Sequence, residues 1–96
     1  MQEIHLVGIN HKTSKVSDRE RFIIDESNLI YLNDFLRLKL DKRISGFFGL
    51  STCNRTEIYF YGDKGIENDV LKLTKEALNI SDIPDKNFYI YDSLKA

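Results

Sequence analysis

The order of two hydrophobic periodicities along 96 residues is the feature that most constrains the fold of this chain. Apolar residues recur at helical spacing over residues 25–40 and again over residues 66–78. Short apolar or alternating segments, which are typical of strands, lie before, between and after these two repeats. The predicted strands span residues 4–9, 45–52, 56–61 and 88–91. The predicted order is therefore strand, helix, strand, strand, helix, strand.

This order predicts an α+β domain with the ferredoxin-like βαββαβ topology. Two helices would cover one face of a four-stranded antiparallel sheet, with the first strand in a central position. Asp25 or Ser27 can cap the longer helix, and Ser17 with Glu20 fits a capping box for a further short helix. The chain is long enough for one domain and too short for two. Residues 92–96 resemble the start of another helix, so we interpret the chain as a single-domain piece of a longer protein.

Charge and cysteine content indicate which partners and which cellular compartment the protein is expected to have. The 14 Lys and Arg residues nearly balance 15 Asp and Glu residues, giving a net charge of −1, which argues against a surface devoted to nucleic acid. A local basic cluster follows the first strand, and interleaved carboxylates favour a solvated face over a nucleic-acid contact there. Its cations are Lys12, Lys15, Arg19 and Arg21. The single cysteine, the lack of a signal peptide and the lack of a membrane-spanning apolar run predict a cytoplasmic protein without membrane association.

The connection between the second and third predicted strands is the candidate functional segment. It contains neither Gly nor Pro, so its residues are poor choices for a turn that only reverses direction. Cys53 would be the nucleophile, since the Arg55 cation nearby favours the reactive thiolate. The planar fork of Arg55 also suits a carboxylate. Thr52 and Asn54 add a hydroxyl and an amide that could hold a substrate amine or polarise a carbonyl.

The residue pattern alone leaves alternatives open for the same segment. A lone cysteine is more often a small, inert, buried side chain, and this interpretation is favoured for Cys53 when spacing is considered alone. His11 lies in the polar loop after the first strand, where it could fold over the Cys53 turn or belong to an ordinary loop. His5 lies within the first strand and is interpreted as a core or sheet residue.

Two strings of residues change this balance. Gly-Ile-Asn-His-Lys-Thr at residues 8–13 and Leu-Ser-Thr-Cys-Asn-Arg-Thr-Glu-Ile-Tyr at residues 50–59 resemble the N-terminal catalytic domain of glutamyl-tRNA reductase. The resemblance covers essentially the whole chain. It implies NADPH-dependent reduction of glutamyl-tRNA to glutamate-1-semialdehyde, on the way to 5-aminolevulinate in tetrapyrrole (porphyrin) biosynthesis. It also implies that Cys53 forms a glutamyl thioester and that Thr52, Asn54 and Arg55 bind the substrate.

The resemblance further implies what lies outside this chain. The NADPH-binding domain, the dimerisation domain and a functionally important histidine of the family would follow residue 96. The five glycines of the chain do not form the glycine-rich phosphate loop of a dinucleotide site. Expected partners are glutamyl-tRNA, a second copy of the full-length protein and, in a possible complex, the next enzyme of the pathway.

Two hypotheses of other classes remain. The first is a non-catalytic ferredoxin-like module that binds RNA or regulates another protein, since fold alone does not determine function. The second is a redox-sensing thiol at Cys53, whose behaviour would depend on oxidation and not on Arg55.

Overall fold

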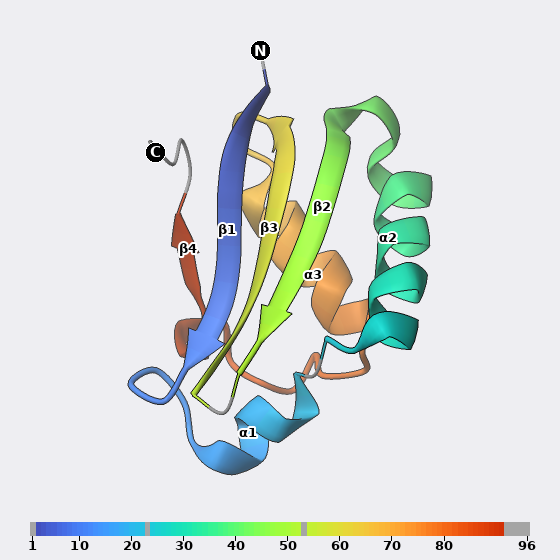
Figure 1. Ribbon diagram of the computed structural model, residues 1–96. Helices are drawn as coiled ribbons and strands as arrows, with labels where there is room; N and C mark the ends of the chain where they lie inside the picture. Colours follow the sequence, from blue (N-terminus) through green and yellow to red (C-terminus); the bar gives the residue numbers. More distant parts are fainter. Residues whose placement is uncertain (1, 23, 53, 92–96) are drawn as a thin grey trace.

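The computed structural model describes residues 2–22, 24–52 and 54–91 (Figure 1). Its strands are β1 (Gln2–Asn10), β2 (Ile44–Ser51), β3 (Arg55–Asp63) and β4 (Tyr89–Tyr91). Its α-helices are α1 (Val16–Arg21), α2 (Glu26–Leu40) and α3 (Glu67–Ala77), with 3-10 turns at Asp41–Arg43 and Asp85–Asn87. Cys53 and the helix expected at residues 92–96 lie outside the described residues. Within those described ranges, no helix combines the length and apolar content needed to cross a bilayer.

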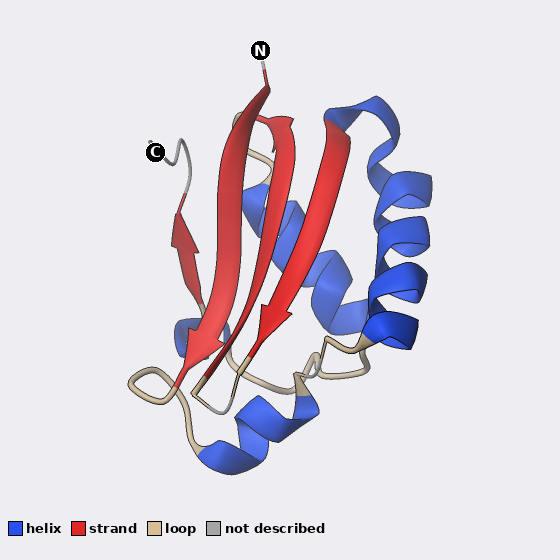
Figure 2. Cartoon of the chain, viewed as in Figure 1, coloured by secondary structure: helices blue, strands red, loops and turns tan. Residues whose placement is uncertain are grey.

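The four strands form one antiparallel sheet in the order β2-β3-β1-β4 (Figure 2). β1 is central and pairs with β3 on one side and with β4 on the other. This arrangement confirms the predicted α+β fold, the ferredoxin-like order and the central place of the first strand. The register sets Gly8 of β1 between Glu57 of β3 and Tyr89 of β4, which brings three distant segments together.

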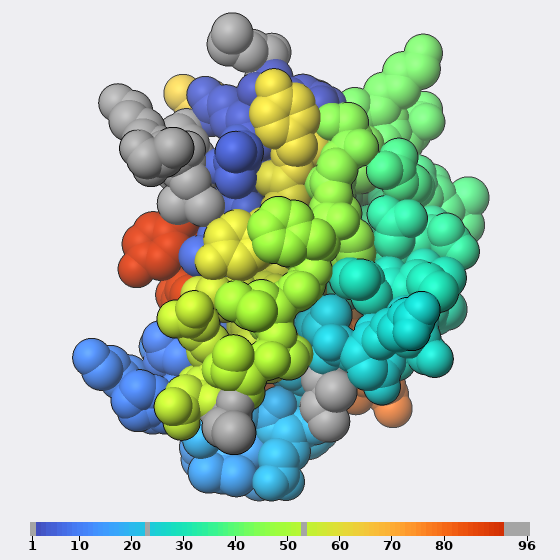
Figure 3. Space-filling view, viewed as in Figure 1, coloured from blue at the N-terminus to red at the C-terminus, as the bar shows by residue number. Residues whose placement is uncertain are grey.

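The two faces of the sheet differ in what covers them. α2 and α3 pack on one face, where the alternating side chains of β1 and β3 form the core (Figure 1). The core includes Val7, Ile9, Leu32, Leu36, Ile58, Phe60 and Val70. His5 is also buried on this side, with Nδ1 2.7 Å from Glu67 Oε1, which confirms its place in the core. None of the helices in the described ranges covers the other face, and the side chains of β2 and β3 come to the surface there (Figure 3).

The helix termini confirm one predicted cap and correct another. The carboxylate of Asp25 accepts the backbone N–H of Asn28 at 2.8 Å, as predicted for the start of α2. The predicted capping box at Ser17 is wrong, because α1 begins at Val16 with Lys15 as its N-cap and no side-chain hydrogen bond. α1 also lies outside the layer formed by α2 and α3, below the β2–β3 connection (Figure 1). The structure therefore places a third helix beside the candidate segment.

Candidate functional site

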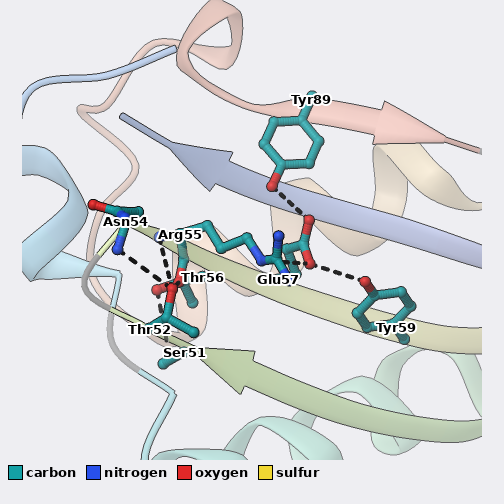
Figure 4. A network of polar contacts seen from close by, with 8 residues as sticks. All are labelled: Ser51, Thr52, Asn54, Arg55, Thr56, Glu57, Tyr59 and Tyr89. Atoms are coloured by element: carbon teal, nitrogen blue, oxygen red, sulfur yellow. Dashed lines mark hydrogen bonds and ion pairs between the residues drawn. The ribbon is translucent and has the colours of Figure 1, made fainter. Parts of the chain in front are cut away.

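The β2–β3 connection is shaped by one threonine hydroxyl. The backbone N–H of Thr52 donates to the Arg55 carbonyl at 2.8 Å and closes the turn. Thr52 Oγ1 accepts the backbone N–H groups of Asn54 and Arg55, each at 3.3 Å (Figure 4). This hydroxyl provides turn contacts that a sequence without Gly or Pro otherwise lacks. Thr52, Asn54 and Arg55 are all exposed on the described part of this turn.

The loop after β1 lies against the same turn. Asn10 Oδ1 accepts the backbone N–H groups of Lys12 and Thr13, at 2.9 and 3.1 Å, which bends the chain sharply. The backbone N–H of His11 then donates to the Asn54 carbonyl at 3.0 Å. Of the two alternatives left open for this loop, the structure shows its backbone in contact with the β2–β3 turn. The side chain of His11 is exposed, and its role in a site remains a prediction.

Arg55 extends over the uncovered face of the sheet, where it meets a buried carboxylate. Its Nε atom lies 3.4 Å from Glu57 Oε1, and its side chain is 52 % exposed against 9 % for Glu57. Glu57 also accepts the hydroxyl groups of Tyr59 and Tyr89, at 2.9 and 2.6 Å (Figure 4). The sequence pattern alone assigned Glu57 no role, whereas the structure buries it among Arg55, Tyr59 and Tyr89. The available signal was the i, i+2 spacing that places Arg55, Glu57 and Tyr59 on one face of the strand.

The environment of Glu57 keeps both tyrosines protonated. Burial, followed by the hydrogen bond to Glu57, raises the pKa of Tyr89 well above the ordinary value of 10.0. The hydrogen bond to Glu57, followed by burial, raises the pKa of Tyr59 above the same value. Both hydroxyls are therefore hydrogen-bond donors at neutral pH. These two hydrogen bonds offset the cost of burying the Glu57 carboxylate away from water.

A cleft of about 290 Å³ opens between α1 and the β2–β3 turn. Its volume lies near the lower limit of small-molecule pockets, which is appropriate for a single amino-acid group. It is lined by Val16, Arg19, Glu20, Ser51, Thr52, Arg55 and Thr56. Thr52 and Arg55, on either side of Cys53 in the sequence, therefore border a concave surface.

Two of the four cations in the basic cluster predicted after β1 are engaged within the protein. Arg21 donates to both carboxylate oxygens of Asp82, at 2.7 and 2.6 Å. This hydrogen bond lowers the pKa of Asp82 from 3.8 to about 2. Arg19 donates to the Ser14 carbonyl at 2.8 Å and supports the loop that carries His11. The solvated-face interpretation therefore fits better than a dedicated nucleic-acid contact.

Comparison with known proteins identifies the family. Residues 7–96 match the family model described as "Glutamyl-tRNAGlu reductase, N-terminal domain". The chain belongs to the glutamyl-tRNA reductase family. The glutamyl-tRNA reductase of Wigglesworthia glossinidia brevipalpis is 45% identical over 92 residues, covering 88% of this chain. That of Desulfovibrio desulfuricans is 36% identical over 93 residues, covering 93% of this chain.

A solved structure supports the fold independently. Glutamyl-tRNA reductase from Methanopyrus kandleri superposes with a TM-score of 0.61 at 23% sequence identity, covering 94% of this chain. The chain spans 19% of that protein and 20% of each of the two relatives above. The matched region is thus about a fifth of a longer family member. Substrate binding by Thr52, Asn54 and Arg55, and catalysis by Cys53, remain predictions.

Proposed function

We propose that this chain is the part of a glutamyl-tRNA reductase that accepts the glutamyl group, with Cys53 as the acceptor. The observation that carries the proposal is the turn between β2 and β3. It exposes Thr52, Asn54 and Arg55 on either side of Cys53 in the sequence, and Thr52 and Arg55 line a cleft. Family membership supplies the substrate, glutamyl-tRNA, whose ester is an acylating agent.

The proposed step is a transesterification to sulfur. The Cys53 sulfur attacks the carbonyl carbon of the ester, a C–S bond forms, and the C–O bond to the tRNA ribose breaks. The thiol proton ends on the ribose oxygen that leaves, so the products are free tRNA and a glutamyl thioester. No electrons are gained or lost in this step. Arg55 would bind the side-chain carboxylate of the glutamyl group through its guanidinium fork.

We propose that the reduction requires residues outside this chain. The described glycines stand singly on strands or in a turn, so they do not fit the glycine-rich loop that binds a dinucleotide phosphate. They are Gly8, Gly46, Gly49, Gly62 and Gly65. We therefore assign only glutamyl transfer to this chain. NADPH binding and the reduction to glutamate-1-semialdehyde belong, in this proposal, to other parts of the protein. Homodimerisation, a complex with the next enzyme and a cytoplasmic location remain predictions from the family resemblance.

The test is acyl transfer in the absence of NADPH. The protein that contains this chain is incubated with tRNA carrying radiolabelled glutamate, and protein-bound label is measured after tRNA digestion. We expect labelling that neutral hydroxylamine releases, as a thioester requires, and no labelling of Cys53→Ser with an unchanged melting temperature. Labelling retained in Cys53→Ser contradicts the mechanism. Tight binding of uncharged RNA without any labelling would favour the RNA-binding module instead.

A further inference from the structure

The carboxylate of Glu57 lies buried on the uncovered sheet face, near the end of β3 that adjoins the β2–β3 turn, and the proposed reaction gives it no role. Its two oxygens accept two hydroxyl groups, and one of them also forms an ion pair. Oε1 meets the Tyr59 hydroxyl at 2.9 Å and Arg55 Nε at 3.4 Å, and Oε2 accepts the Tyr89 hydroxyl at 2.6 Å. Burying a carboxylate costs several kcal/mol unless it is paired, so this arrangement is under a strong physical constraint.

The first motif of the sequence leaves room for this arrangement. Gly8 lies opposite Glu57 on one side and opposite Tyr89 on the other. A Cβ atom at Gly8 would lie 2.8 Å from Tyr89 Cζ and 2.9 Å from Glu57 Cγ, closer than side chains tolerate. Glu57 and Tyr89 therefore reach each other across β1 only because residue 8 has no side chain.

The Glu57 carboxylate forms an ion pair with the Nε side of the Arg55 guanidinium. The guanidinium is planar and carries five N–H donors in a rigid fork, so an anion that draws Nε toward it restricts the directions in which the two Nη atoms point. Among the described residues, neither Nη atom of Arg55 has a partner. The Nη1–Nη2 edge can therefore receive a carboxylate in bidentate geometry.

We propose that Glu57, held by Tyr59 and Tyr89, is the positioning residue that orients Arg55 toward the carboxylate of the glutamyl group. This inference rests on the proposed function. It predicts that Glu57 determines selectivity for a negatively charged side chain, without touching the substrate. A residue that only supported the fold would affect charged and uncharged substrates equally.

The test compares tRNA carrying glutamate with the same tRNA carrying glutamine, which has the same shape and no charge. In single-turnover labelling, Glu57→Gln should slow transfer of the glutamyl group about a hundredfold, the scale expected for a misplaced binding group. Transfer of glutamine should change little, so the preference for glutamate collapses. Tyr89→Phe should act in the same direction more weakly. Tyr91→Phe is the matched control: Tyr91 is 54% exposed on the same strand and face, and should have no effect.

Two further measurements separate the possible failures. Adding Glu57→Gln to Arg55→Ala should cause no additional loss, and the Arg55 Nε proton should exchange faster with water in Glu57→Gln. Equal losses with both substrates, or unchanged Nε exchange, would overturn the inference while leaving the proposed function intact. Absence of labelling in the unsubstituted protein would overturn the proposed function and this inference with it. If Glu57→Gln does not fold, Tyr89→Phe gives the same comparison with the carboxylate retained.

Discussion

Thr52 illustrates how a single hydroxyl can serve both the backbone and a site. It accepts the N–H groups of two residues in the turn, and it also borders the cleft beside α1. Such side-chain turns are local, and they let a connection dispense with glycine. At the residue scale, the Thr52 hydroxyl therefore first stabilises the backbone of Asn54 and Arg55, beside which it also lines a cleft.

Replacing Thr52 with Val tests this role, because valine keeps the shape and loses the acceptor. Two exposed hydrogen bonds are lost, so the free energy of unfolding should fall by about 1 kcal/mol. Glutamyl labelling should slow by about tenfold, because the turn no longer holds Arg55 and Asn54 in place. Thr52→Ser retains the hydroxyl and is the matched control. Urea denaturation and single-turnover labelling give the two values, and a Ser variant as impaired as the Val variant would contradict the argument.

The burial of Glu57 is the feature of the site that could not be predicted from the sequence. The motif strings predict where the exposed polar residues of the turn lie, since their order in the sequence is also their order in the hairpin. The burial of Glu57 depends instead on Tyr89, which is 32 residues away and reaches it only through the β1–β4 register. Register between strands distant in sequence is not encoded in local periodicity, so this contact could not be predicted.

At the scale of elements, the predicted strands and long helices agree with the structure to within about two residues because each pattern matches one buried face. Asp25 was predictable as a cap because its carboxylate satisfies a free N–H group of its own helix. α1 was less predictable, since a helix of 6 residues is stabilised by its surroundings. Arg21 ties its last turn to Asp82, which lies in the connection between α3 and β4.

The Arg21–Asp82 pair predicts a dependence of stability on pH. The pKa of Asp82 is lowered from 3.8 to about 2, chiefly by its hydrogen bond from Arg21. A carboxyl with a lower pKa in the folded state stabilises the fold above its ordinary pKa and loses that contribution as the pH falls. Asp82→Asn should therefore lower the melting temperature near neutral pH, by a difference that vanishes as the pH falls toward about 2.

The control for this prediction is Arg21→Gln, which removes the partner. In that background Asp82→Asn should change the melting temperature little at any pH, because both charges act through the same pair. A pH-dependent difference that persists without Arg21 would show that another cation holds Asp82.

At the scale of the whole molecule, one sheet separates the apolar core from the polar network to which we assign substrate binding. The face covered by α2 and α3 holds the apolar core, and the other face holds Arg55, Glu57 and the tyrosines. Phe48 stacks on Tyr59 at 4.9 Å on this second face, so the network has an aromatic border. The core face was predictable from alternation and helical spacing. The second face was not, because a buried polar network looks like an ordinary solvated strand pattern in the sequence.

This separation predicts that a cavity in the core lowers stability without altering substrate preference. Leu36 is fully buried in α2, so Leu36→Ala should lower the free energy of unfolding by about 2–5 kcal/mol. Leu38 in the same helix is 79% exposed, and Leu38→Ala should change the free energy of unfolding by less than about 0.5 kcal/mol. Denaturant unfolding measures both free-energy changes.

Below its unfolding temperature, Leu36→Ala should keep the ratio of glutamyl to glutaminyl transfer, because the rigid sheet lies between the cavity and Arg55. A ratio altered as strongly as in Glu57→Gln would mean that the two faces are coupled.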